Sequence, residues 1–375
     1  MKKLYAIALV LGMAAQVATA GNDTKRGQAG ATELLINPWA RSTGWNGANS
    51  GSVRGIESMS LNIAGLAYVK NTDLIIANQR YLSGSGINIL SLGFGQRLSP
   101  TGVLGMTFTS LSLGDFIQTT YALPEGTNNT FSPSFFNFGL SYAKTFSSRI
   151  TGGLLVRGIY QGISNAQAFG VAFDAGIQYQ SGPNNEFKFG VALRNVGPKL
   201  QYSGEGLSFR GQRDQIGLTL GSRVAPFEMP AMLNIGASYD FNFKEQELRL
   251  TPAFNFTSNS YTNDNLVPGV ELAFREMFML RASYMFRQTF SVPEAAARTD
   301  VYTGLAAGAT IELPLAEMFG AKGAAEITGT SLSDGASADG APAKKKSDIT
   351  VGIDYSYRPT NPFSGTHGLG FVVKF

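Results

Sequence analysis

The chain ends with the stretch GLGFVVKF, residues 368–375, whose side chains alternate between two kinds. Leu369, Phe371, Val373 and Phe375 fall on one face, because successive side chains of a β-strand point to opposite sides. A soluble edge strand is the alternative, but an apolar face that ends on a terminal aromatic residue is typical of an outer-membrane β-barrel. We therefore predict that Phe371, Val373 and Phe375 form the signal for assembly into the outer membrane.

The same alternation recurs along most of the chain after residue 70. In each segment the apolar residues share one face, and glycine, small polar or charged residues share the other. Representative apolar series are Phe136/Phe138/Leu140/Tyr142, Val171/Phe173/Ala175/Ile177, Leu233/Ile235/Ala237/Tyr239 and Ile349/Val351/Ile353/Tyr355. This pattern suits the wall of a barrel, which meets lipid on its outer face and the lumen on its inner face.

The composition agrees with a barrel. Only 15% of the residues are charged, while glycine (45) and phenylalanine (26) are abundant; about a quarter of a soluble domain is charged. The chain has no cysteine, which excludes disulfides and thiol chemistry. The formal net charge is +4. It falls to about +2 without Lys2 and Lys3, which is too little to favour nucleic acid as a partner.

Residues 1–20 are typical of a signal peptide. The basic pair Lys2-Lys3 precedes an apolar run over residues 4–17, and the run is too short to span a bilayer comfortably. Ala18-Thr19-Ala20 then supplies the small residues at which signal peptidase cuts. We expect export through the inner membrane.

Counting strands requires the loop lengths as well as the alternation. Fifteen candidate strands begin near residues 72, 86, 103, 134, 149, 169, 186, 212, 231, 247, 267, 277, 300, 347 and 367. A bacterial single-chain barrel has an even number of strands, with short periplasmic turns and longer extracellular loops. If the segment at 212–224 belongs to a loop, all five tight turns lie on one side. The sequence therefore predicts an all-β fold, a 14-stranded antiparallel transmembrane β-barrel, over residues 71–375.

Three segments fall outside this pattern. Residues 21–70 lack clean alternation, and we expect them to form an N-terminal plug inside the barrel. Residues 197–229 form the predicted long extracellular loop. Residues 315–346, rich in Gly, Ala, Ser and Asp, are predicted to be a flexible periplasmic loop because they bury too little apolar surface to offset ordering.

Fourteen strands behind a plug resemble the FadL-like barrels. Several short motifs resemble those of the PorV/PorQ family in particular. The element with Arg41 and Gly44 resembles that family's "xARxxG", and Asn62-Ile63-Ala64-Gly65-Leu66 resembles "NPAGL", with Ile63 in place of the proline. We single out Arg41, Gly44, Asn62 and Gly65 as the plug motif. The stretch at 195–200, NVGPKL, is similar to the family's "NxGPKL".

The resemblance implies a function in the type IX secretion system of Bacteroidota. In that family the barrel partners the giant SprA/Sov translocon. It receives folded cargo through the cargo's C-terminal domain and delivers it to the PorU attachment complex. The alternatives are passive transport of hydrophobic small molecules, as in FadL itself, or an accessory role in another outer-membrane machine. A pull-down of the stable partner would separate them.

No catalytic, cofactor-binding or metal-binding constellation is visible, so we expect no enzyme activity and no cofactor. The single histidine, His367, lies in a glycine-rich turn without identifiable catalytic partners, and a local hydrogen bond is the simpler interpretation. Charged residues of both signs are predicted to point inward, where they pair with one another and with plug carbonyls. They are Arg157, Asp174, Lys188, Arg194, Asp240, Arg249, Glu271, Arg275, Arg281, Arg287, Asp354 and Arg358.

The long loop at 197–229 is the best candidate for a functional surface. It carries apolar residues on a strand-like alternation, which could fold over the barrel mouth as a lid or could bind a partner by strand addition. We predict partner binding through Leu207, Phe209, Ile216 and Leu218.

Overall fold

The fold is described from a computed structural model that places residues 25, 27–213, 216–287, 301–315 and 349–375, with the side chains of 212–216 excepted. The predicted signal peptide lies outside these residues, and so does the predicted flexible loop, apart from Leu315. None of the helices in the described ranges is long and apolar enough to cross a membrane.

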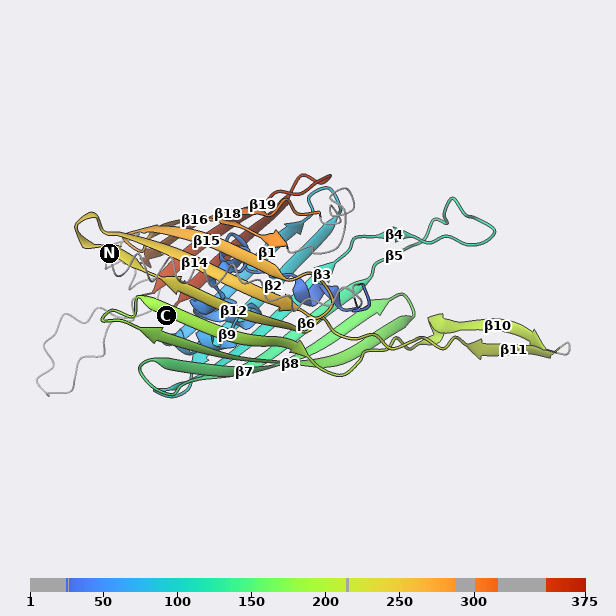
Figure 1. Ribbon diagram of the computed structural model, residues 1–375. Coiled ribbons are helices and arrows are strands. Elements are labelled where there is room, and N and C mark those ends of the chain that lie inside the picture. Colours follow the sequence, from blue (N-terminus) through green and yellow to red (C-terminus); the bar gives the residue numbers. More distant parts are fainter. Residues whose placement is uncertain (1–24, 26, 214–215, 288–300, 316–348) are drawn as a thin grey trace, which may run out of the picture.

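Fourteen antiparallel strands form one closed barrel (Figure 1). They are β1 (Thr72–Tyr81), β2 (Ile87–Arg97), β3 (Gly102–Ser112), β6 (Ser134–Thr145), β7 (Ile150–Ile163), β8 (Ala166–Ser181), β9 (Phe187–Val196), β12 (Met232–Tyr239), β14 (Leu248–Asn259), β15 (Asn265–Phe274), β16 (Phe278–Tyr284), β18 (Leu305–Pro314), β19 (Thr350–Arg358) and β20 (Thr366–Lys374). Two short segments, β13 (Phe241–Phe243) and β17 (Phe286–Arg287), continue β12 and β16 along the same neighbours.

The barrel closes where β20 pairs with β1. Phe371 lies opposite Ile76 and Val373 opposite Leu74 in this register, and the amide of Phe375 donates to the carbonyl of Thr72 at 2.8 Å. Closure leaves no unpaired sheet edge in the hydrocarbon, where an unsatisfied backbone group is costly.

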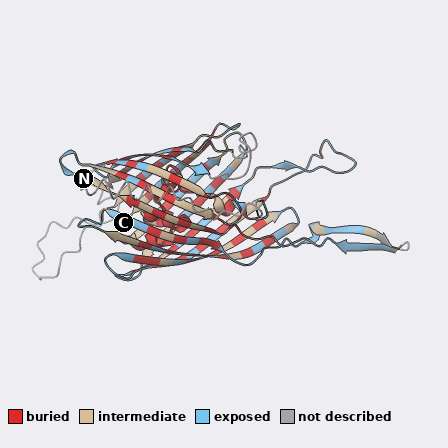
Figure 2. Cartoon of the chain, viewed as in Figure 1, coloured by how far each residue is buried: buried red, intermediate tan, exposed pale blue. Residues whose placement is uncertain are grey.

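Burial alternates along the strands as the sequence predicts (Figure 2). Phe138 and Leu140 are exposed on the outer face, while Asn137 and Ser141 are buried on the inner face. The fourteen-strand prediction is confirmed, and the predicted starts lie within about five residues of the observed ones. The segment near residue 212, which the loop lengths exclude as a spanning strand, belongs to a separate hairpin formed by β10 (Ser208–Arg213) and β11 (Ile216–Gly221).

The chain before β1 runs through the lumen as short helices (Figure 1). They are η2 (Thr32–Leu35), α2 (Ala40–Thr43), η3 (Ala48–Gly51), η4 (Ile56–Ser60) and η5 (Ile63–Tyr68). Trp39, Met59 and Leu66 are almost completely buried and pack with Val103 and Leu155 of the wall in one apolar cluster. We call residues 27–70 the plug segment.

Glycines let the backbone of the plug segment lie directly on the wall. A Cβ atom added at Gly51 would stand 2.4 Å from the carbonyl oxygen of Gly236, and one at Gly44 would stand 2.9 Å from the Cα of Gly308. Such approaches leave no room for a side chain on either partner. The abundance of glycine on the inner face therefore follows from contact with the plug segment.

We predict that Gly236→Ala loosens the plug segment. Its new methyl group would meet the Ser50 hydroxyl at 2.1 Å and the Gly51 amide nitrogen at 2.6 Å, and overpacking of this kind costs about 1–3 kcal/mol. The thermal midpoint in detergent should fall and protease should cut the plug segment faster. The control is Gly158→Ala, whose methyl group would have only the Phe138 oxygen within reach, at 3.9 Å. Equal effects of the two changes would contradict the prediction.

We also predict that Phe375→Ala lowers the amount of folded barrel in outer membranes, because it removes the terminal aromatic residue of the closing strand. The measurement is the heat-modifiable fraction on gels. Phe274→Ala is the matched control, since Phe274 is an exposed aromatic at the end of β15, a strand that is not the last. If both variants assemble equally well, Phe375 acts only as one more aromatic residue facing lipid.

Candidate functional site

The described residues show no arrangement for catalysis or metal binding. No three of their His, Asp and Glu side chains come together as a metal site would require. His367 is the second residue of β20 rather than part of the preceding turn, and its Nδ1 lies 2.8 Å from the hydroxyl of Tyr355. The histidine thus makes a hydrogen bond, as predicted, but across two paired strands rather than within a turn.

Arg41 ties the plug segment to the wall. Its Nε lies 3.1 Å from Oδ1 of Asp354 in β19, and its Nη2 lies 3.3 Å from Oε1 of Glu312 in β18. Glu57 of η4 lies 4.0 Å away, and Lys374 of β20 also contacts Glu312. Because Asp354 and Glu312 are almost inaccessible to water, each needs these cationic partners to remain charged.

The other three plug-motif residues each have a local structural role. The Asn62 side chain caps η5 by accepting from the amide of Ala64 at 3.2 Å, and its Nδ2 donates to the Ile177 carbonyl of the wall at 3.1 Å. A Cβ atom at Gly65 would stand 2.1 Å from the Val53 oxygen. Together with Gly44, these residues position the plug segment; a role of the motif beyond that stays a prediction.

The inward charges pair largely as predicted. Arg157 donates to Asp174 at 3.0 Å and to the Met59 carbonyl of the plug segment at 3.1 Å, and Arg281 donates to Glu271 at 2.6 Å. The prediction is wrong for Arg194, which donates to the sulfur of Met232, and for Arg358, which lies over the Tyr302 ring at 3.8 Å; neither pairs with a carboxylate or a plug carbonyl in the described part of the chain. It is also wrong for Arg275, which lies in a tight turn with its side chain 57% exposed and pairs with Glu247. Arg275 directly follows the last residue of β15, so the chain has already left the sheet and the strand alternation no longer sets the direction of this side chain.

The NVGPKL stretch turns the chain out of the barrel. Asn195 has φ 58° and donates its amide to Asp174 at 2.6 Å, where β8 and β9 shift register. A Cβ atom at Gly197 would stand 2.2 Å from the Val171 oxygen. Lys199 lies 2.9 Å from Glu228, and the hydrogen bond from its ammonium lowers the pKa of that carboxyl. The motif is therefore the foot of the 197–229 segment.

We call residues 197–229 the long arm, and its base is fixed by contacts with the barrel and the plug segment. At the base Leu200 and Phe227 exchange backbone hydrogen bonds of 2.9 and 2.8 Å. Leu200 and Met229 pack with Leu34 of the plug segment in a buried cluster. Beyond this base the β10–β11 hairpin projects away from the barrel rather than over its mouth (Figure 1). The lid alternative does not describe this geometry.

The long arm carries the residues predicted to bind a partner, and the structure places only some of them together. Phe209 (54% exposed) and Leu218 (39%) are on the same face of the hairpin, and Leu220 lies opposite Phe209 in the register. Leu207 belongs to the short helix η6 (Glu205–Leu207) before the hairpin and is half-buried. Ile216 lies in β11, and its side chain is outside the described part.

A second projection, residues 113–133, was missed by the sequence reasoning. We call it the short arm; it contains β4 (Phe116–Ile117) and β5 (Thr130–Phe131), and it extends from the same end of the barrel as the long arm (Figure 1). Ile117, Tyr121 and Leu123 are exposed. The sequence signal for this projection is a set of four large apolar residues that the structure exposes, Phe116, Ile117, Tyr121 and Leu123, in an otherwise polar loop. Strands of only two residues show no alternation by which they could be predicted.

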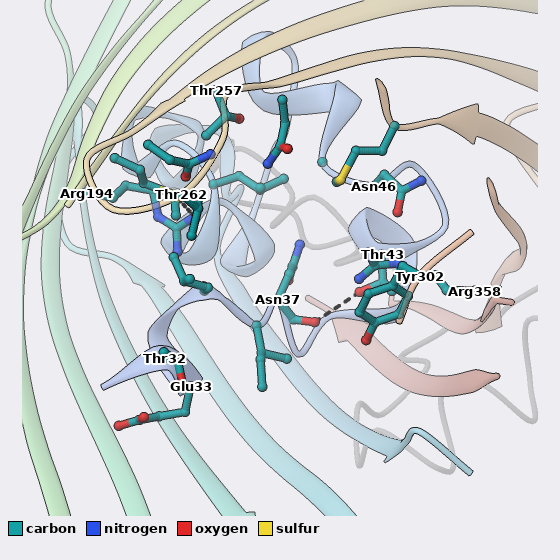
Figure 3. Close-up of a pocket in the computed structure, with 18 of the residues that line it drawn as sticks. Thr32, Glu33, Asn37, Thr43, Asn46, Arg194, Thr257, Thr262, Tyr302 and Arg358 are labelled. Atoms are coloured by element: carbon teal, nitrogen blue, oxygen red, sulfur yellow. Dashed lines mark hydrogen bonds between the residues drawn. The ribbon is translucent and has the colours of Figure 1, made fainter. Parts of the chain in front are cut away.

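A cavity lies inside the barrel, lined by residues of the plug segment and of the wall (Figure 3). Leu111 and Phe135, on either side of the short arm, line it, so it lies at the end from which the arms project. Its volume is about 730 Å³, and we call it the vestibule. Its floor is formed by the plug segment, including Glu33, Asn37 and Thr43, and Arg194 and Tyr302 also line it. Short turns and both ends of the barrel domain lie at the opposite end, so the vestibule faces the cell exterior.

Comparison with solved structures supports the fold. CymD, a monoaromatic hydrocarbon channel, superposes with a TM-score of 0.53 at 13% identity, over 91% of this chain and 98% of that chain. The toluene transporter TodX of Pseudomonas putida gives 0.48 at 13% identity, over 90% and 98%. A FadL homologue of Pseudomonas aeruginosa gives 0.48 at 12% identity, over 90% and 97%. At 13% identity the match to CymD shows the fold alone.

Comparison of sequences identifies the secretion system. The family model described as "Type IX secretion system membrane protein PorP/SprF" matches residues 84–330, well over half of the chain. No curated protein sequence matches the chain. The PorV/PorQ resemblance thus leads to the right secretion system, while assignment to PorV itself stays a prediction.

We predict that Arg41→Gln weakens the anchoring of the plug segment, because it leaves Asp354 and Glu312 without their shared cation. Breaking a buried pair typically costs about 3–5 kcal/mol, and the partial exposure of Arg41 reduces that figure. Thermal unfolding should show the loss. The double variant Arg41→Gln/Asp354→Asn should recover part of it, as a double-mutant cycle detects. Strictly additive losses would show that the two residues do not interact.

Proposed function

Because the chain belongs to the type IX secretion system membrane protein family PorP/SprF, we propose that it is a non-enzymatic adaptor that holds a protein partner at the outer surface of the outer membrane. The observation that carries the proposal is the long arm. Its hairpin projects beyond the barrel and presents apolar side chains that nothing else in the described chain covers (Figure 1).

The hairpin has two features of a docking element. Phe209, Leu218 and Leu220 form an apolar face, whereas Arg210 and Thr219 are opposite each other on the second face. Among the described residues, β10 and β11 pair only with one another, so each has a free backbone edge. Exposed apolar surface and free edges together favour addition of a partner strand.

The partner that this proposal names is the SprA/Sov translocon. In the finer form that the PorV resemblance implies, the adaptor takes cargo through its C-terminal secretion domain and passes it to the PorU attachment complex. The firm base supports this use, since Leu200 and Met229 hold the arm in place while Phe209 and Leu218 of the hairpin are exposed.

The plug segment disfavours the alternative of passive transport. A transported hydrophobic compound needs an apolar route through or around the plug. The wall contacts of the plug segment are instead backbone on backbone at Gly51 and Gly236, and ionic at Arg41 and Asp354. An accessory role in another outer-membrane machine has no observation in its favour, while the family match points to type IX secretion.

The test is the triple change Phe209→Ser/Leu218→Ser/Leu220→Ser. We expect normal assembly, loss of co-purification with the translocon and accumulation of cargo in the periplasm, because the apolar face is gone. The matched control is Arg210→Ser/Thr219→Ser on the opposite face of the same hairpin, which should behave as wild type. Normal secretion and co-purification by the triple variant would contradict the proposal.

A further inference from the structure

The vestibule contains a buried arginine that lacks a carboxylate of its own. Arg194 of β9 is 6% exposed, and within the described residues its guanidinium makes one hydrogen bond, to the sulfur of Met232 at 3.4 Å. Its Nε has no partner. Sulfur is a weak acceptor, and a buried charge without a counterion is costly.

The nearest acidic group is already engaged. Asp174 accepts from Arg157 through one carboxylate oxygen and from the Asn195 amide through the other. Its ion pair is therefore with Arg157, and the described residues show none between Asp174 and Arg194. Glu33, the single acid among the residues that line the vestibule, accepts from Gln161 at 2.7 Å. The geometry leaves room for one further anion at Arg194.

Two other walls of the vestibule indicate what kind of molecule would supply that anion. Ile87 of β2, Leu111 of β3 and Phe135 of β6 form an apolar wall. Leu113, the first residue of the short arm, and Leu35 and Ile36 of the plug segment extend it. Asparagine and threonine side chains of β12, β14 and the neighbouring turn form an amide-rich wall. Amides offer both donors and acceptors, as a peptide backbone requires.

We propose that the vestibule receives an extended, acidic segment of the protein partner, with a carboxylate pairing with Arg194 and apolar side chains lying on the β2–β3–β6 wall. The volume suits a short segment, since ligand cavities commonly measure about 300–1,000 Å³. Residues of the plug segment, among them Asn37 and Thr43, form the inner side of the cavity. This inference rests on the proposed function for the source of the segment, because the vestibule and the arms share one end of the barrel.

The experiment uses the full-length barrel in nanodiscs and three end-capped, fluorescein-labelled heptapeptides in which leucine alternates with glutamate, glutamine or lysine. Anisotropy should show saturable binding of the glutamate peptide, with the glutamine peptide weaker by roughly tenfold or more, as expected for a hydrogen bond to a charged group. The lysine peptide should not bind. Arg194→Gln should abolish the preference for glutamate over glutamine.

Two controls separate the vestibule from other surfaces. Arg80→Gln removes an exposed arginine at the same end of the barrel, on the outer face of β1, and should change nothing. Leu113→Trp fills the cavity without touching the charge and should weaken both peptides. The triple arm variant should bind the peptides normally, so that failure of the arm proposal and failure of this one give different results.

Several results would overturn the inference. They are equal binding of the glutamate and glutamine peptides, retention of the preference in Arg194→Gln, or absence of saturable binding. A separate titration uses sodium hexanoate in place of the peptides. If hexanoate binds and depends on Arg194 while no peptide does, the site takes small carboxylates and the assignment to a protein segment is wrong.

Discussion

The pairing of β20 with β1 is the constraint on which the rest of this structure depends. In hydrocarbon every backbone group needs a partner, so the sheet must close. Closure of fourteen strands creates a lumen wider than side chains can fill, since about eight strands mark the limit at which they can. The lumen must therefore hold water or polypeptide. In this protein it holds the plug segment, and the inner face is built around that segment.

Two kinds of contact hold the plug segment, and they need different inner-face residues. Glycine at positions such as Gly236 and Gly308 brings backbone against backbone and fixes the distance. Arg41, with Asp354 and Glu312, adds directional ionic contacts between segments far apart in the sequence. With glycine contacts alone, polar groups of the plug segment would lack partners on the wall. With charged pairs alone, empty space would remain between the plug segment and the wall. The low content of charged residues and the high content of glycine both follow from this division.

The sequence predicts the wall well because lipid imposes one simple rule on every second residue. The β10–β11 hairpin follows the same alternation, and only the loop lengths separate it from a spanning strand; its strands have six residues each, fewer than the roughly nine to eleven that span a bilayer. The conformation of the plug segment is not predictable in this way, since tertiary contacts determine its short helices. The pairing of Arg41 with Asp354, and the missing partner of Arg194, depend on which strands meet across the lumen.

The long arm and the vestibule, the two surfaces proposed to bind a partner, are in contact with each other at the exterior end of the protein. Leu200 and Met229 at the base of the long arm pack against Leu34, next to Glu33 on the vestibule floor. The arm and the floor of the vestibule are therefore one packed unit, held by apolar contacts. The remainder of the plug segment is held separately, by Arg41 and by the glycine contacts. A partner bound to the arm and the vestibule would thus act on the first part of the plug segment and leave the seal of the lumen in place. Under the proposed adaptor function, partner binding would therefore act on one part of the plug segment while the ionic contacts of Arg41 hold another part.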